Sequence, residues 1–239
     1  MVWIAGADGC KKGWFRVSLE IDTFEFRYDC VERAWDLLES APYPEVLGLD
    51  IPIGLEENKA RECDKEARKC LGWPRSSSVF PSPIRPTLVT ESYDEACRKS
   101  KKYLGKKIPI QTYCLFPKIR EVDGLLQKNK MLLDKVIEVH PEVSFWKWAN
   151  KPMEYNKKTR EGREERLKLV NDTFKADVFG NARKELKQRG LLKQDVADDD
   201  ILDAFATLWT ARRWKEGKAL CLPKARVTDK AGFPMQIVF

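Results

Sequence analysis

Residues 2–19 read VWIAGADGCKKGWFRVSL, and their pattern is the strongest indication of the fold. The stretch opens with an uninterrupted apolar run that ends in Asp8, a pattern typical of a strand buried on both faces. Two glycines then bracket a short turn, and apolar and polar residues alternate from residue 14 onward. Alternation resumes over residues 24–28, after a second turn. This order predicts three strands that form an antiparallel meander.

The next segments predict a parallel partner for the first strand. A short helix is expected over residues 31–40, and VLGLD at residues 46–50 repeats the pattern of an apolar run that ends in an acid. A strand, a crossover helix and a second strand place the two strands parallel in one sheet. Another apolar strand follows at residues 135–139. The sequence therefore predicts an α/β fold with a mixed sheet and helices on both faces.

The rest of the chain is predicted to be mainly helical, within a single domain that covers residues 1–239. Residues 55–130 have the pattern of a helical insertion, and the last helix of this insertion is expected over residues 111–127. The remaining expected elements are helices over residues 159–173, 175–189 and 199–216, and a C-terminal pair of strands within residues 219–239.

Composition limits the class of protein. Hydrophobic residues make up 43% of the 239 residues and charged residues 34%, as in a soluble globular protein with a proper core. No apolar stretch approaches the roughly 20 residues that a membrane-spanning helix needs, and the N-terminus lacks the features of a signal peptide. We therefore expect a cytoplasmic protein without a membrane partner. Seven scattered cysteines and one histidine argue against structural zinc and a disulfide framework.

Three acidic residues, Asp8, Asp50 and Glu138, stand at or near the ends of predicted strands. Ligands of open α/β sheets bind at the carboxyl ends of the strands. Asp50 also has apolar residues on both sides, so a buried Asp50 carboxylate needs a partner. Each residue has an ordinary alternative role: Asp8 can begin an Asp-Gly turn, and Glu138 can face water from an edge strand. Their shared position favours a functional site.

The last predicted helix carries the strongest single signal. Between residues 201 and 211 its only charged residue is Asp203, which lies nearly opposite the apolar stripe of the helix. The residues around Asp203 are small or short, whereas a solvated face would carry Lys and Glu. Asp203 therefore enters a packed environment, where an isolated carboxylate is costly. Asp200, in the acidic first turn, has the alternative role of complementing the helix dipole.

Together these carboxylates fit an all-oxygen site for Mg²⁺ or Mn²⁺. We expect Asp8, Asp50 and Asp203 to be metal ligands, with Glu138 and Asp200 as supporting ligands or as a catalytic base. Two such ions about 3.5–4 Å apart activate a water and stabilise the leaving oxygen of a phosphoryl displacement. The carboxylates therefore predict a metal-dependent phosphodiester hydrolase.

Basic residues recur on two predicted helices: Arg61 and Arg68, with Asp64, on one, and Lys157, Arg160, Arg163 and Arg166 near the start of another. Such groups bind phosphates, but salt-bridged solvated faces have the same pattern. The net charge of +7 permits a polyanionic partner without requiring one. The serines at residues 76–78 lack the GxSxG pattern, so we do not expect a serine triad with His140.

A series of motifs along the chain resembles one family: GADGCKKGW at residues 6–14, LDIPIGL at 49–55, RECDKEAR at 61–68, SVFP at 78–81, PKIREVD at 117–123, EVHPEVSF at 138–145, EGR at 161–163 and DDILDA at 199–204. The family is domain-of-unknown-function family 429, described as predicted RNase H-fold nucleases. Asp200 with Asp203 is also similar to the closing-helix motif of crossover-junction resolvases. The resemblance implies an RNase H-like core and nuclease activity.

The resemblance also marks positions that a minimal RNase H site would not need. These positions imply that the insertion folds over the edge of the sheet and closes a pocket. A closed pocket favours a small phosphorylated substrate or a nucleotide over a long duplex. The substrate contacts expected on this basis are Arg61, Asp64, Arg68, Lys118, Glu121, His140, Glu142 and Arg163.

Two other functions stay open at this point. Sugar kinases and actin-like ATPases share the same core, so the chain could be a phosphotransferase or a nucleotide phosphohydrolase that acts on a small phosphorylated substrate. A non-catalytic module would instead bind nucleic acid with strong salt dependence and without a metal site. The expected partner is therefore nucleic acid or a small phosphorylated substrate, and no pattern indicates an oligomeric state.

Overall fold

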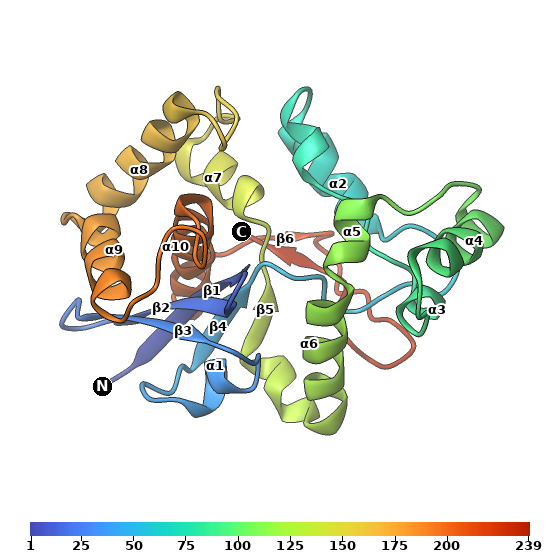
Figure 1. Cartoon of the computed structure of the whole chain (residues 1–239), viewed down its shortest axis with the longest axis horizontal. Coiled ribbons are helices and arrows are strands. Elements are labelled where there is room, and N and C mark those ends of the chain that lie inside the picture. The colour runs from blue at the N-terminus through green and yellow to red at the C-terminus, as the bar shows by residue number, and fades with distance from the viewer.

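A five-stranded sheet forms the centre of the computed structural model, which describes residues 1–239 (Figure 1). Across the sheet the strands are β3 (Phe26–Val31), β2 (Gly13–Glu20), β1 (Trp3–Cys10), β4 (Val46–Leu49) and β5 (Val136–Glu138). β1, β2 and β3 pair antiparallel, whereas β4 and β5 continue the sheet from β1 in the parallel direction. The predicted α/β class and mixed sheet are confirmed, and this arrangement is consistent with an RNase H-like fold.

The register of the parallel strands brings their carboxyl ends together. Ala7 of β1 pairs with Leu49 of β4, and Leu49 pairs with Glu138 of β5. Asp8 and Asp50 each come one residue after the Ala7–Leu49 pair. Since parallel strands end at the same edge of a sheet, the three predicted carboxylates lie along one edge.

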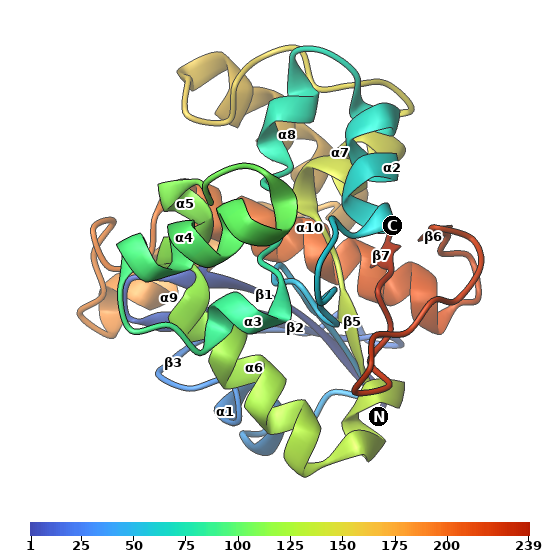
Figure 2. The ribbon, with the colours of Figure 1, turned by 90° about the vertical axis from the view of Figure 1, so that its right-hand side faces the viewer.

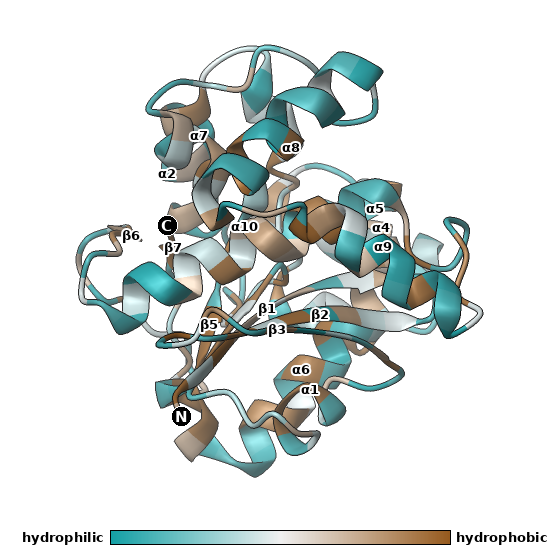
Figure 3. Ribbon diagram, turned by 90° about the vertical axis from the view of Figure 1, so that its left-hand side faces the viewer, coloured by the Kyte–Doolittle hydropathy of each residue, from teal (hydrophilic) through white to brown (hydrophobic).

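Helix α10 (Asp198–Lys215) packs directly on β1 and β4. A Cβ atom on Gly6 would lie 2.1 Å from the backbone nitrogen of Leu208, and one on Gly48 would lie 2.6 Å from the carbonyl oxygen of Thr207. The two glycines therefore let the helix backbone touch the sheet. Helices α7 (Pro141–Ala149) and α8 (Arg160–Phe174) contact other faces of α10, which thus lies between them and the sheet (Figure 3). The prediction that α10 is packed on more than one side is confirmed.

The opposite face of the sheet is covered by α1 (Asp36–Glu39) and α6 (Phe116–Lys128). α6 buries Ile119, Val122 and Leu126 in the same apolar cluster as Leu47 of β4. The last helix of the expected insertion 55–130 is therefore part of the cover of the sheet. The division of the chain into a core and an insertion stays a prediction.

The prediction of one continuous helix over residues 111–127 is wrong. The structure has two helices there, α5 (Ile110–Cys114) and α6, which meet at Leu115. Pro117 falls in the first turn of α6, where its missing N–H breaks no helical hydrogen bond. In the middle of one long helix the same proline would remove a bond and clash with the preceding turn.

A further group of elements lies beyond the carboxyl edge of the sheet. Helix α2 (Glu62–Leu71) contacts α7 and the C-terminal strands β6 (Cys221–Leu222) and β7 (Ile237–Val238) (Figure 2). Helix α7, which no sequence pattern predicted, begins at Pro141 and buries Val143 against α2. The remaining elements are η1 (Arg75–Ser78), α3 (Arg85–Leu88), α4 (Tyr93–Leu104), η2 (Lys130–Asp134) and α9 (Val178–Gln188).

No helix in the structure combines the length and the apolar character that a membrane crossing requires.

Candidate metal centre

Three carboxylates meet where the parallel strands end. Each of Asp8, Asp50 and Asp203 has an oxygen in a group whose atoms all lie within 4.8 Å of one another. Asp8 comes from β1, Asp50 directly follows β4, and Asp203 lies in the second turn of α10. The close packing of α10 on the two strand glycines holds Asp203 at this edge. The structure thus brings together the three residues predicted to be metal ligands.

A cavity of about 290 Å³ lies over this carboxylate cluster. Its walls come from the ends of β1, β4 and β5, from α2 and the loop after η1, and from the start of α7. The predicted site residues that line it are Asp8, Asp50, Glu138, Asp200, Asp203, Arg61, Asp64, Lys118, His140 and Glu142. Arg68, Glu121 and Arg163 do not line it.

Two carboxyl groups of the cluster have raised pKa values, so their charged forms are disfavoured. Burial, then the neighbouring Asp50 and Asp203, raise the pKa of Asp8 well above its usual range. Burial and then Asp203 raise the pKa of Asp50 to about 8. With its pKa near 8, the Asp50 carboxyl retains a proton at neutral pH unless a cation compensates its charge.

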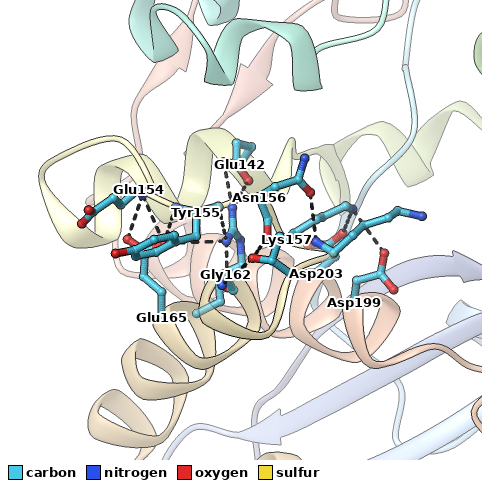
Figure 4. A network of polar contacts seen from close by, with 12 residues as sticks. Glu142, Glu154, Tyr155, Asn156, Lys157, Gly162, Glu165, Asp199 and Asp203 are labelled. Atoms are coloured by element: carbon cyan, nitrogen blue, oxygen red, sulfur yellow. Dashed lines mark hydrogen bonds and ion pairs between the residues drawn. The ribbon is translucent and has the colours of Figure 1, made fainter.

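Lys157 supplies a positive charge at this cluster. Its Nζ lies 2.5 Å from Oδ2 of Asp203 and 3.9 Å from Oδ2 of Asp199 (Figure 4). Although burial alone would lower the pKa of Lys157, Asp203 and Asp8 raise it above its usual range. The local sequence pattern indicates Lys157 as a possible phosphate contact but does not reveal its contact with Asp203. The two residues are 46 positions apart, so no local pattern could have shown the contact.

Glu138 belongs to a second charged group, beside the first. Arg61 donates two hydrogen bonds to the Glu138 carboxylate, at 2.8 and 2.6 Å, and two more to Oδ1 of Asp64, at 2.6 and 3.2 Å. The carbonyl oxygens of Ile53 and Gly54 accept from the same guanidinium. Cys63, Asp64 and Glu138 also have closely spaced ligand atoms, but here the cation between the carboxylates is the Arg61 guanidinium.

The chain's single histidine faces the cavity. Burial and then the positive charge of Lys157 lower the pKa of His140 to about 4, so the imidazole is neutral at pH 7. Nδ1 of His140 is buried and has no hydrogen-bond partner in the protein. The neighbouring Glu142 accepts two hydrogen bonds from Arg166, at 2.9 and 2.7 Å, so its carboxylate is already paired.

Lys118 and Asp200 also line the cavity, and each already forms a polar contact within the protein. Nζ of Lys118 lies 4.6 Å from the ring centroid of Trp14 and donates to the carbonyl oxygen of Gly13. A Cβ atom on Gly9 would lie 2.7 Å from Cδ of Lys118, so a glycine at this position makes room for the lysine. Oδ2 of Asp200 accepts a hydrogen bond of 2.8 Å from the backbone nitrogen that precedes α10.

The three predicted residues outside the cavity make contacts within the fold. Arg68 donates to the carbonyl oxygen of Val79 at 2.9 Å and so holds the loop after η1. Glu121 accepts from the indole of Trp14 at 3.0 Å. Arg163 forms an ion pair with Asp198 at 2.8 Å. None of these three side chains opens onto the cavity.

Comparison with known proteins gives one match. The family model described as "Protein of unknown function (DUF429)" matches residues 6–228. No curated protein and no solved structure matches the chain.

Proposed function

The chain belongs to the DUF429 family, and from its site we propose that it is a metal-dependent hydrolase of phosphodiesters. The observation that carries this proposal is the group of oxygens from Asp8, Asp50 and Asp203 beneath a cavity. Carboxylates gathered this closely repel one another, and this repulsion adds to the effect of burial in raising the pKa values of Asp8 and Asp50. A divalent cation removes the repulsion, which supports a metal site here.

The donor set supports Mg²⁺ or Mn²⁺ over softer metals. The three ligands are all carboxylates, and hard divalent ions prefer oxygen donors. When bound, such an ion supplies Lewis-acid chemistry: it lowers the pKa of water and neutralises the charge that develops on a phosphoryl group. Asp8, Asp50 and Asp203 would hold it, and Asp200 at the cavity wall would support the arrangement.

Three other side chains have the position and chemistry to act on a phosphorylated substrate. Lys118 and Lys157 bring positive charge to the cavity wall, where they can bind phosphoryl oxygens. The imidazole of His140 lines the cavity and is neutral at pH 7, so it can exchange a hydrogen bond or a proton with the substrate. Arg61 has its donors committed to Glu138 and Asp64, so we assign it to positioning the cavity wall.

The size of the cavity favours a small substrate or the end of a nucleic-acid strand. Its volume of about 290 Å³ is at the lower limit of small-molecule pockets, which span roughly 300–1,000 Å³. Ser78, Val79 and Phe80 form part of its wall, beyond the edge of the sheet. A nucleotide phosphohydrolase is therefore the second candidate function, since it needs the same carboxylates and a smaller groove.

The test is an assay of the purified protein with MnCl₂ or MgCl₂ on bis(p-nitrophenyl) phosphate, single- and double-stranded DNA and RNA, and a panel of nucleotides. We expect hydrolysis with metal, none with EDTA, and recovery after metal is restored. A preparation of Asp8→Asn purified in parallel controls for contaminating nucleases. Phosphate transfer from ATP without hydrolysis would favour a phosphotransferase. Salt-dependent nucleic-acid binding without Mn²⁺ binding would favour a non-catalytic module.

Metal affinity should rise with pH. At pH 6 the Asp50 carboxyl, whose pKa is raised to about 8, is protonated, so Mn²⁺ must displace a proton. We expect the association constant to increase by roughly tenfold per pH unit for each proton displaced, and to level off above about pH 8. Isothermal titration at pH 6, 7 and 8, in buffers of different ionisation enthalpy, measures both the affinity and the protons released. An affinity that is constant from pH 6 to pH 8 would contradict this prediction.

A further inference from the structure

The ammonium group of Lys157 lies where a cation is needed. It contacts Asp203, whose side chain is 3% exposed, whereas the Lys157 side chain is 39% exposed. Lys157 also lines both the cavity over the carboxylates and a neighbouring surface hollow formed by residues 157–160 and the start of α10. The ammonium group is therefore held at the carboxylates while part of its flexible stem is open to solvent.

The loop that carries Lys157 is firmly anchored on its N-terminal side. It connects α7 and α8, and the buried side chain of Arg166, from α8, contacts its backbone. Arg166 donates to the carbonyl oxygen of Tyr155 at 3.2 Å while it pairs with Glu142. The Glu165 carboxylate accepts from the backbone nitrogens of Glu154, at 2.9 Å, and of Tyr155, at 3.3 Å. The backbone before Lys157 is therefore fixed by a paired, buried charge.

The loop is equally constrained on either side of Lys157. A Cβ atom on Gly162 would lie 1.9 Å from the carbonyl oxygen of Asn156, so α8 begins against the loop backbone. The same oxygen accepts a hydrogen bond of 2.9 Å from the hydroxyl of Thr159, and the Asn156 side chain accepts one of 3.0 Å from the nitrogen of Lys158. These contacts fix the backbone of the loop, and the fixed backbone places Lys157 at the cluster.

We propose that Lys157 is a resident cation of the carboxylate cluster, which competes with the divalent metal for Asp203 and turns to the substrate phosphoryl group when the metal binds. The proposal rests on the function proposed above. An ammonium group and a divalent ion bound to the same carboxylate repel each other at short range, so each weakens the binding of the other. The stem of Lys157 is long and partly exposed, and the same side chain lines the cavity into which it would turn.

This arrangement gives Lys157 two roles. In the metal-free protein it compensates the charge of carboxylates that would otherwise repel one another. In the metal-bound protein it adds positive charge near the substrate. Its removal should therefore strengthen metal binding and weaken turnover, which are opposite effects. If the ion pair between Lys157 and Asp203 were purely structural, removing Lys157 would instead lower metal binding and turnover together, because the site would lose its shape.

The test is isothermal titration of MnCl₂ into the wild type, Lys157→Met and Lys158→Met, with thermal melting of each metal-free protein. Methionine keeps the length of the stem without its charge, and Lys158 is an exposed lysine on the same loop. We expect Lys157→Met to bind Mn²⁺ roughly tenfold more tightly, from the loss of one nearby positive charge. It should also melt at a lower temperature without metal and regain more stability from Mn²⁺ than the wild type does. Lys158→Met should match the wild type.

The outcomes distinguish failure of this inference from failure of the proposed function. If the wild type binds Mn²⁺ and Lys157→Met binds it with equal or lower affinity, Lys157 is not a competing cation, and the proposed function stands. If neither protein binds Mn²⁺ at any concentration tested, the proposed function fails, and this inference fails with it. Tighter binding by Lys157→Met, with a lower rate of phosphodiester hydrolysis at saturating Mn²⁺, supports both.

Discussion

Replacing Asp203 by Asn is expected to lower kcat/KM for Mn²⁺-dependent hydrolysis by about 10³-fold, which corresponds to roughly 4 kcal/mol of transition-state stabilisation. Asparagine keeps the shape of the side chain but removes the negative charge and one oxygen ligand. Asp203 is 2% exposed, and one of its oxygens lies in the close group formed with Asp8 and Asp50. Steady-state kinetics with MnCl₂ and titration of Mn²⁺ into the variant measure the two losses, which should occur together.

A matched control is Asp199→Asn. Asp199 lies in the first turn of the same helix, its oxygen is 3.9 Å from Nζ of Lys157, and it is not part of the cavity wall. It shares the electrostatic surroundings of Asp203 without a place among the three ligands. We expect this variant to keep activity close to that of the wild type. Equal losses in the two variants, or full activity in Asp203→Asn, would count against the assignment of Asp203.

The second large effect is expected from Arg61→Met, on stability. The guanidinium is 2% exposed and lies between the buried carboxylates of Asp64 and Glu138. Breaking a buried ion pair by removing one partner typically costs about 3–5 kcal/mol, because the other charge is left unpaired. For a protein of this size that cost corresponds to a melting temperature lower by roughly 10 °C. Differential scanning calorimetry of the variant measures the change.

The control for this prediction is Lys65→Met, in helix α2, which begins directly after Arg61. Lys65 pairs with Glu62 at 2.8 Å, but both side chains are more than half exposed. Exposed pairs contribute about 0–1 kcal/mol, so the melting temperature should change little. If Arg61→Met melted as the wild type does, the guanidinium would not be a structural part of the cavity wall. Its predicted role as a substrate contact would then regain support.

Much of the fold could be predicted because its signals are local. Apolar runs and alternation mark β1 to β4, and the order of strand, helix and strand fixes which strands are parallel. Asp203 could be found because it is the single charge on a helical segment of otherwise apolar or small residues. The structure shows why that segment is so: Gly6 and Gly48 bring its backbone onto the sheet.

The contacts that organise the site could not be predicted, because they join distant segments through long side chains. Arg61 reaches Glu138 across 77 positions, and Lys157 reaches Asp203 across 46. A basic residue on an amphipathic helix has the same local pattern whether it binds substrate, pairs in the interior or faces water. For this reason Arg61, which the sequence suggested as a phosphate contact, proves to be engaged with two carboxylates of the protein.

The proposed function requires that Asp8, Asp50 and Asp203 hold a divalent metal. The most direct measurement is the anomalous difference density of Mn²⁺ in crystals soaked in MnCl₂ at pH 8, where Asp50 is at least partly ionised. We expect a peak within bonding distance of all three carboxylates, with the ammonium group of Lys157 displaced from Asp203. Crystals that bind Mn²⁺ elsewhere, or leave this position empty with Lys157 still on Asp203, would contradict it.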